Sequence, residues 1–310
     1  MNTFFSILIP AFKSTYLKEC LDSILAQTYL HFEVIVVNDA SPEPLDEIVQ
    51  NYKDNRIRYY KNRKNFGAVD VVDNWNKCLD YSRGDYVICM GDDDRLCPNC
   101  LEVYKNLIDQ YPGIGLLHGW TEVINENSEV IELSTHRCQK ESAMSLLWHR
   151  IHAYSIQYIG DFCYNAKDLK SRGGFYKLPA AWGSDNISAV IAAGKNGVVN
   201  TQEVVFQYRR NTRTISLGAN FSEKMTGVCL EEKWLNDFVS VSCESYLDEL
   251  YRKQLVNEIK TVAEKKKSVL ISYDLRKNGI SRLFYWIKRR NEFSYSWKAI
   301  AIGLVKKIVL

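Results

Sequence analysis

The sequence predicts an α/β protein built on a mostly parallel sheet, followed by a helical C-terminal region. Continuous apolar runs that suit buried strands alternate with segments whose apolar residues recur at helical spacing. This alternation is typical of a parallel sheet covered on both faces. From about Glu223 onward, helical periodicity replaces the strands, and Lys and Arg become more frequent. We therefore expect one domain at residues 1–220 and a helical region at residues 221–310.

Strands and helices are expected in alternation along the first domain. Leu17, Leu21 and Ile24 recur at helical spacing and predict the first helix. In the first part of the chain, strands are expected at residues 4–10, 32–37, 57–60 and 86–90, with helices at 15–27, 45–52 and 70–82. The later part predicts helices at 99–111, 140–150 and 187–193, strands at 114–120, 159–165 and 198–208, and a hairpin at 122–133.

Three consecutive carboxylates follow one of the predicted strands. Asp92, Asp93 and Asp94 come after the apolar run 86–90, and Asp39 follows the strand at 32–37. Adjacent carboxylates raise one another's pKa unless a cation compensates. Mg²⁺ and Mn²⁺ prefer carboxylate and phosphate oxygens. A solvated acidic turn is the alternative, but ligands bind at the carboxyl ends of such strands, so these acids together favour a site.

Composition narrows the class of protein. The chain has 310 residues and 46% hydrophobic content, which is enough for a large core. The net charge of +3 is mild and predicts no nucleic-acid partner. Nine cysteines without a disulfide framework favour a reducing, cytoplasmic compartment. The first residues lead directly into a strand, which predicts that no signal peptide is present, and no apolar run reaches the length of a membrane span.

The C-terminal residues mix aromatic and basic side chains. Between Leu275 and Leu310, Glu292 is the single acid among nine Lys or Arg. Apolar side chains accompany these charges, at Phe284, Tyr285, Trp286, Ile287, Trp297, Ile300, Ile302, Leu304 and Ile308. The pattern suits a helix lying on an anionic membrane, here the inner face of a cytoplasmic membrane. The alternative is a helical appendage that packs on the protein, and both interpretations remain open.

Three segments resemble the opening of family 2 glycosyltransferases with the GT-A fold. They are SILIPAF at residues 6–12, SILAQTY at 23–29 and EVIVVNDAS at 33–41. Gly84-Asp85-Tyr86 then leads into the acid triplet, as it leads into the DxD region of that family. The resemblance covers roughly residues 4–216 and implies a UDP-sugar donor together with Mn²⁺ or Mg²⁺.

The resemblance also implies roles for individual residues. It assigns nucleotide-sugar contacts to Pro10, Ala11, Phe12, Asp39, Asn65, Gly67, Asp92, Arg209 and Arg210. Among these, Asp39 would bind the uracil, Asp92 the ribose, and the two arginines would lie near the diphosphate. Asp93 would hold the metal, with Asp94 as an alternative ligand. Gly91 stands where the family usually has the first acid of its motif, and Asn211 stands where many members carry histidine.

The predicted catalytic base is Asp185. The acceptor hydroxyl must lose its proton as it attacks, and a carboxylate within hydrogen-bond reach can take it. The position of Asp185 at a helix N-terminus favours the ionised form, although aspartate at such a position often only caps the helix. A single base without a nucleophilic carboxylate implies inversion, and Asp161 is the next acid to consider. Trp182 could stack on an acceptor sugar or belong to the core.

These observations together predict an inverting, metal-dependent glycosyltransferase. It would move a sugar from a UDP-sugar to a hydroxyl of a saccharide or lipid-linked acceptor, in cell-surface polysaccharide synthesis. One alternative is a nucleotidyltransferase, but the loop at residues 10–15 has no glycine, which argues against the commonest type. A non-catalytic sugar-nucleotide-binding scaffold is the other alternative, and the sequence leaves homo-oligomer formation open.

Overall fold

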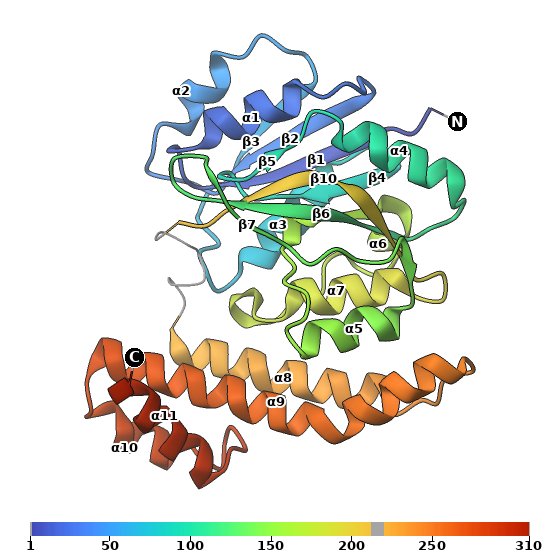
Figure 1. Cartoon of the computed structure of the whole chain (residues 1–310). Helices are drawn as coiled ribbons and strands as arrows, with labels where there is room; N and C mark the ends of the chain where they lie inside the picture. The colour runs from blue at the N-terminus through green and yellow to red at the C-terminus, as the bar shows by residue number, and fades with distance from the viewer. Residues whose placement is uncertain (1, 212–219, 310) are drawn as a thin grey trace. The chain divides into compact units, whose positions relative to one another are not determined.

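A computed structural model describes residues 2–211 and 220–309 of the chain (Figure 1). The described residues divide into two compact units. The first unit takes its residues from 1–177 and 184–214, and the second from 178–183 and 215–310. The boundary expected at residues 220 and 221 places residues 178–183 in the first domain, whereas in the structure they belong to the second unit.

The first unit contains the sheet. Its strands are β1 (Phe5–Ala11), β2 (Phe32–Asn38), β3 (Ile57–Lys61), β4 (Tyr86–Cys89), β5 (Arg95–Leu96), β6 (Leu116–Ile124), β7 (Val130–Leu133), β8 (Lys140–Glu141), β9 (Phe162–Asn165) and β10 (Val198–Arg209). Its helices are α1 (Leu17–Leu25), α2 (Leu45–Gln50), α3 (Val71–Tyr81), α4 (Cys100–Gln110), α5 (Ala143–Ile151), α6 (Ala166–Ser171) and α7 (Ser184–Ala193), with the 3-10 turn η1 (Ile159–Asp161).

The main path of the sheet runs in the order β3-β2-β1-β4-β9-β6-β10-β5. Strands β1 to β4 pair in parallel, and β6 pairs in parallel with β10. Strand β9 lies between these two groups and is antiparallel to both of its neighbours. The structure therefore confirms the predicted α/β fold with a mostly parallel sheet.

The strands are buried because helices cover both faces of the sheet. Every residue of β2 is buried, as the continuous apolar run predicted. Helix α1 turns Leu17, Leu21 and Ile24 toward the sheet, where they join one core cluster with Ile7 and Ile9 of β1. Figure 1 shows α1, α2 and α4 on one side of the sheet and α3, α6 and α7 on the other.

Two details differ from the sequence-based expectation. Strand β6 extends to Ile124, so the strand expected at 114–120 continues into the expected hairpin, and β7 is the returning strand. Strands β5 and β8 were not expected. Each has two residues, which is too short for a periodic pattern to reveal.

The strand register decides where the candidate residues meet. Ala11 at the end of β1 pairs with Asn38 of β2, and Leu8 pairs with Cys89 of β4. The backbone N–H of Asp39 then donates to Ala11 O at 2.9 Å. The segments that follow β1, β2 and β4 therefore leave the sheet at one edge, as parallel strands require.

The second unit is helical and has its own core. It contains α8 (Phe221–Phe238), α9 (Tyr246–Asn278), α10 (Arg282–Lys288), α11 (Trp297–Val309) and the 3-10 turn η2 (Pro179–Ala181). Trp286 is fully buried in this core, and its Nε1 donates to Asp274 at 2.7 Å. Ile300 is also buried, whereas Phe284 is 72% exposed and Trp297 59% exposed. The packing alternative therefore holds for Trp286 and Ile300, and Phe284 and Trp297 remain on the surface.

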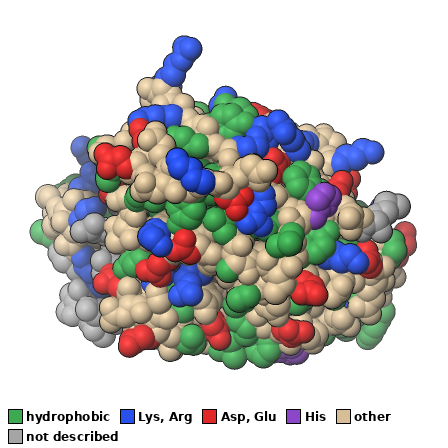
Figure 2. Space-filling view, turned by 90° about the horizontal axis from the view of Figure 1, so that it is seen from above, with side chains coloured by type: hydrophobic (Ala, Val, Ile, Leu, Met, Phe, Trp, Pro, Cys, Tyr) green, Lys and Arg blue, Asp and Glu red, His purple; other side chains and the backbone are tan. Residues whose placement is uncertain are grey.

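Two observations concern the surface. None of the helices within residues 2–211 and 220–309 combines the length and the apolar character needed to cross a membrane. On the face drawn in Figure 2, Lys and Arg side chains are intermixed with Asp and Glu side chains. This mixture agrees with the small net charge of the whole chain.

Candidate functional site

The loop after β4 begins with a glycine that its own acids require. A Cβ on Gly91 would lie 2.7 Å from Asp93 Oδ1 and 2.9 Å from Asp94 Oδ2, closer than real Cβ contacts. Glycine is therefore the residue that lets the two carboxylates fold back over this position.

Asp92 connects this loop to the segment after β1. Its side chain is buried, and Oδ2 accepts the backbone N–H groups of Phe12 at 2.6 Å and Lys13 at 2.7 Å. Burial and then the charge of Asp93 raise the pKa of Asp92 to about 6, although the two backbone hydrogen bonds oppose the shift. Asp92 thus fixes the predicted nucleotide loop of Pro10, Ala11 and Phe12 against the acid triplet.

Both carboxylate oxygens of Asp94 accept hydrogen bonds from backbone N–H groups. Its Oδ1 accepts the backbone N–H of Arg209 at 2.9 Å, and its Oδ2 accepts that of Gly91 at 3.2 Å. The residue is 3% exposed, and burial followed by the charge of Asp93 raises its pKa. These two hydrogen bonds hold the loop to β10, and the small exposed fraction of Asp94 leaves it less open to a metal ion than Asp93.

Asp93 is the least buried acid of the triplet, with 17% of its side chain exposed. Its Oδ2 accepts a hydrogen bond from Asn211 Nδ2 at 2.6 Å and lies 3.8 Å from Lys13 Nζ. The sequence analysis did not identify Lys13. Its position directly after the nucleotide loop, at the carboxyl end of β1, was the signal that could have found it.

The residues fit a metal ion held partly by a substrate. Within the described parts of the chain, no group of three or more His, Cys, Asp or Glu side chains is placed to hold a metal by itself. Mg²⁺ and Mn²⁺ at phosphate sites commonly take one or two protein carboxylates and complete their shell with phosphate oxygens and water. Asp93 can supply such a carboxylate, while backbone N–H groups donate to Oδ2 of Asp92 and to both oxygens of Asp94.

Asp39 lies buried at the end of β2, in a network that leaves it acceptor capacity. Its Oδ1 accepts from Asn62 Nδ2 at 2.9 Å and from the backbone N–H of Phe66 at 3.0 Å. Oδ2 accepts a hydrogen bond from the same Phe66 N–H, at the longer distance of 3.2 Å. Asn65 Nδ2 donates to Asp39 O at 2.9 Å, and Gly67 continues the turn with a φ of 70°. The turn of Asn65 and Gly67, which was predicted to contact the nucleotide-sugar, is thus attached to Asp39.

Arg209 does not have the position that the resemblance implied. Its guanidinium is buried beneath the acid loop and donates to Asp93 O, Asn125 O, Ser128 Oγ and Glu19 Oε2 at 2.9–3.0 Å. Since Nε, Nη1 and Nη2 all have protein acceptors, this side chain stabilises the loop and is not available to a diphosphate. Arg210 is half exposed and forms an ion pair with Glu132 at 2.6 Å.

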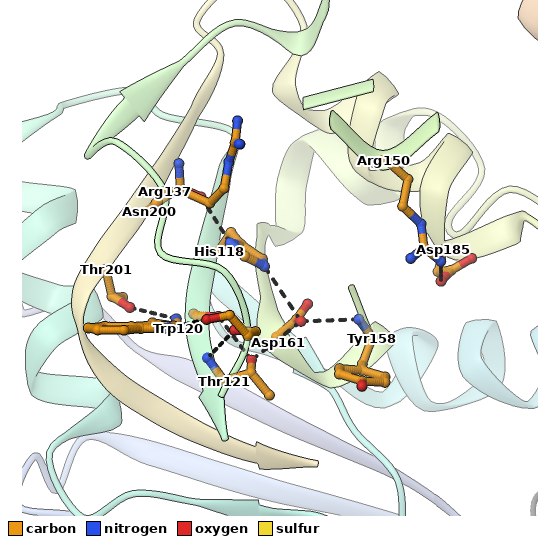
Figure 3. Close-up of polar contacts among 12 residues, drawn as sticks. His118, Trp120, Thr121, Arg137, Arg150, Tyr158, Asp161, Asp185, Asn200 and Thr201 are labelled. Atoms are coloured by element: carbon orange, nitrogen blue, oxygen red, sulfur yellow. Dashed lines mark hydrogen bonds and ion pairs between the residues drawn. The ribbon is translucent and has the colours of Figure 1, made fainter. Parts of the chain in front are cut away.

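Asp185 lies in the first turn of α7, beside an arginine from α5 (Figure 3). Its Oδ2 is 3.9 Å from Arg150 Nη2, and 21% of the Asp185 side chain is exposed. Arg150 Nε also donates to Asn186 Oδ1 at 2.7 Å, so one side chain connects α5 to two residues of this turn. The arginine and the helix N-terminus both place positive charge beside this carboxylate.

Asp161 belongs to a buried network (Figure 3). Its Oδ2 lies 3.5 Å from His118 Nε2 and accepts the backbone N–H of Tyr158 at 3.1 Å, and His118 Nδ1 contacts Asn200 Oδ1 at 2.9 Å. Burial lowers the pKa of His118, but Asp161 and Asn200 outweigh burial and raise it. Asp161 has no exposed surface, so it cannot meet an acceptor hydroxyl.

Trp182 follows a turn with unusual backbone angles in the second unit. Ala180 and Ala181 have φ values of 58° and 54°, and Gly183 has 99°. A left-handed conformation costs a non-glycine residue about 1–3 kcal/mol, and such strain often marks functional segments. Trp182 itself is half-buried, with Lys224 Nζ 5.7 Å from its ring centroid.

The fold is that of GT-A glycosyltransferases, and the comparison with family models is specific. Residues 6–165 match the model of glycosyl transferase family 2. The chain therefore belongs to glycosyl transferase family 2. This membership confirms the resemblance seen in the opening segments and in the acid loop.

Two relatives share part of their sequence with this chain. An uncharacterized glycosyltransferase of Methanocaldococcus jannaschii is 32% identical over 120 residues, which cover 38% of this chain and 40% of that protein. The glycosyltransferase GlyG of Streptococcus pneumoniae is 30% identical over 113 residues, which cover 36% of each chain. The chain thus spans two fifths or less of the length of these curated relatives.

Solved structures share the fold across almost the whole chain. TarS of S. aureus has a TM-score of 0.67 at 15% identity, covering 98% of this chain and 53% of that one. TarS 1–349 in complex with UDP has a TM-score of 0.67 at 16% identity, covering 98% and 88%. The mannosyltransferase PcManGT of Pyrobaculum calidifontis, in complex with GDP-Man and Mn²⁺, has a TM-score of 0.55 at 14% identity, covering 98% and 87%.

Proposed function

We propose that this chain is an inverting, metal-dependent glycosyltransferase that moves a sugar from a UDP-sugar to a hydroxyl of a saccharide or lipid-linked acceptor. The observation that carries the proposal is the shared edge of the sheet at which β1, β2 and β4 end. Phe12, Asp39 and Asp93 all follow strands that leave the sheet there, and Pro10 and Ala11 are the last two residues of β1. Synthesis of a cell-surface polysaccharide is the setting that we propose for this reaction.

Each group has a defined task in this proposal. Asp39 Oδ2 accepts a hydrogen bond from the uracil, and Lys13 faces the donor diphosphate. Asp93 contributes a carboxylate to a bound Mg²⁺ or Mn²⁺, which supplies Lewis-acid stabilisation of the leaving diphosphate. Asp185 takes the proton of the attacking hydroxyl. The buried position of Asp161 supports Asp185 as the base, and direct displacement by the acceptor inverts the anomeric centre.

The relatives support the choice of donor and metal. TarS 1–349 has been solved with UDP-GlcNAc and with UDP, and PcManGT with GDP-Man and Mn²⁺. Membership of glycosyl transferase family 2 favours a glycosyltransferase over a nucleotidyltransferase. UDP release from a panel of UDP-sugars with Mn²⁺ tests the proposal, because a non-catalytic scaffold would bind these donors without releasing UDP.

We expect UDP to bind more tightly than GDP and Asp39→Asn to weaken UDP binding by about 10–100-fold. Asparagine keeps the hydrogen bonds at Oδ1 but loses the charged acceptor, and hydrogen bonds to charged groups contribute about 1.5–3 kcal/mol. Calorimetric titration with both nucleotides measures this. Asp54→Asn is the matched control and should bind UDP normally, because Asp54 lies before β3 and is paired with Arg56. Tighter binding of GDP would show that the uracil assignment is wrong.

Peripheral contact with the cytoplasmic face of a membrane is a further part of the proposal. Phe284 and Trp297 are exposed, and Lys288 and Lys298 are exposed near them in sequence. Arg290 lies with its guanidinium 5.1 Å from the Trp297 ring centroid. Aromatic side chains favour the headgroup region, and each basic residue near an anionic surface contributes on the order of 1 kcal/mol.

The double variant Phe284→Ser/Trp297→Ser should bind anionic vesicles at least about 100-fold less tightly than the wild type. Removing two exposed aromatic side chains forfeits on the order of 1.5–3 kcal/mol each if they enter the bilayer interface. Co-sedimentation with phosphatidylglycerol vesicles at low salt measures the effect. Val241→Ser/Leu247→Ser removes two exposed apolar side chains elsewhere on the second unit and should bind as the wild type does. Wild-type protein that stays in the supernatant would exclude membrane contact.

A further inference from the structure

Lys224 is a buried lysine for which the described residues supply no anionic partner. It lies in the first turn of α8 and is 4% exposed. Among residues 2–211 and 220–309, no carboxylate pairs with its ammonium. The contacts of Nζ are the rings of Phe221 and Trp182, with centroids at 5.0 and 5.7 Å. A buried charge is costly unless it is paired, and aromatic faces return only part of that cost.

The surroundings of Lys224 add positive charge. Figure 1 shows the start of α8 beside the end of α9, where Lys277 lies, and α8 turns its positive N-terminal end to this position. Burial and then Lys277 lower the pKa of Lys224. Arg289 Nη1 donates to Ser222 Oγ in the same turn of α8. Glu223, the acid next in sequence, is engaged in a capping box with Asn220.

This arrangement is suited to receive an anion. An ammonium group with unused donors, next to a helix N-terminus, is the usual chemistry of phosphate binding. Trp182 offers a flat face beside the charge, and such a face can stack on a sugar ring. Its backbone is fixed by the strained turn of Ala180 and Ala181, which positions the ring.

We propose that Lys224, Trp182 and Phe221 form a binding site in the second unit for a phosphate group carried by a substrate. The inference rests on the proposed function, because it assigns the phosphate to an acceptor of the proposed transfer reaction. Lys224 supplies the charge, and Trp182 supports the sugar or polyol next to the phosphate.

The first experiment uses the wild-type chain and chemical labelling. An amine-reactive acylating reagent is applied with and without each probe, and the modification of each lysine is read by peptide mass spectrometry. UDP is the donor-type probe, and glycerol 3-phosphate is the acceptor-type probe. We expect glycerol 3-phosphate to protect Lys224 about 10-fold, while Lys233, exposed on the same helix, reacts equally in all samples. Protection by UDP alone would overturn the assignment of the site to the acceptor.

The second experiment uses Lys224→Met, with Lys233→Met as the control. Methionine keeps a flexible apolar stem against Trp182 and Phe221 but removes the charge. We expect binding of the protecting probe to weaken about 10-fold, whereas the unfolding temperature without a probe stays the same or rises, because an unpaired buried charge is gone. If Lys224 only stabilised the fold, Lys224→Met would bind the probe as the wild type does and would unfold at a lower temperature.

The site is excluded if neither probe protects Lys224, or if Lys224→Met binds both probes as the wild type does. A failure of the proposed function gives a different result. In that case UDP-sugars would release no UDP with Mn²⁺, while protection of Lys224 by glycerol 3-phosphate would persist.

Discussion

Replacing Asp185 by asparagine is expected to lower sugar transfer by about 10²–10⁴-fold while donor binding is retained. Asparagine has the same shape and can still cap the first turn of α7, but it cannot accept the proton of the acceptor hydroxyl. The hydrogen bond from Arg150 Nε to Asn186 remains, so the start of the helix should stay in place. Steady-state transfer and calorimetric titration with UDP separate the two effects.

The matched control for Asp185→Asn is Asp168→Asn. Asp168 is also an aspartate in the first turn of a helix, α6, and it is exposed. This control should transfer sugar at the wild-type rate. If Asp185→Asn does the same, Asp185 only caps α7 and the base lies elsewhere. Loss of UDP binding together with transfer would instead indicate that the variant disturbs the donor site.

Replacing Asp93 by asparagine is expected to reduce transfer by about 10³-fold or more. A metal ion at a leaving diphosphate supplies several kcal/mol of stabilisation, and each 1.36 kcal/mol is tenfold in rate. Asp93 is the acid of the triplet whose carboxylate is not held by backbone N–H groups, so the neighbouring acids should not replace it. Chelation by EDTA should abolish wild-type transfer, and added Mn²⁺ should restore it.

The stability of Asp93→Asn distinguishes loss of metal from loss of structure. The charge of Asp93 raises the pKa of both Asp92 and Asp94, which means that the three carboxylates repel one another in the protein without metal. The unfolding temperature of the variant should therefore stay the same or rise. Asp80→Asn, an exposed position on α3, controls for the loss of one charge. Transfer at the full rate by EDTA-treated wild-type protein would show that the metal role is wrong.

The sequence by itself was sufficient for the order of the elements and the edge of the sheet that carries the site. Apolar runs such as β2 and helical spacing such as that of Leu17, Leu21 and Ile24 are local patterns, because each follows from the period of one element. Parallel strands leave the sheet at one edge, so Asp39 and the acid triplet could be placed together before their contacts were known.

The tertiary structure decided which charged groups face a ligand. Asp92, Asp93 and Asp94 are adjacent in sequence but differ in their contacts. The backbone N–H groups of Phe12 and Lys13 donate to Asp92. Those of Gly91 and Arg209 donate to Asp94. Arg209 is buried for a related reason. Its acceptors come from the loop after β4, from α1 and from the turn after β6. These segments lie far apart in the chain, so no local sequence pattern predicts the set.

Burial of the C-terminal aromatics was also a tertiary outcome. Trp286 packs in the core of the second unit, where Asp274 of α9 accepts its Nε1–H, while Phe284, two residues earlier, is exposed. The mixed basic and aromatic composition was compatible with both positions. The surroundings of Lys224 could not be predicted from local sequence either, because its neighbours in sequence are those of an ordinary polar helix start. Its contacts with Phe221 and Trp182 are known only from the packing. Local periodicity determines which face of a helix or strand is apolar. The partner of a charged side chain depends on which residues, distant in sequence, the tertiary fold brings next to it.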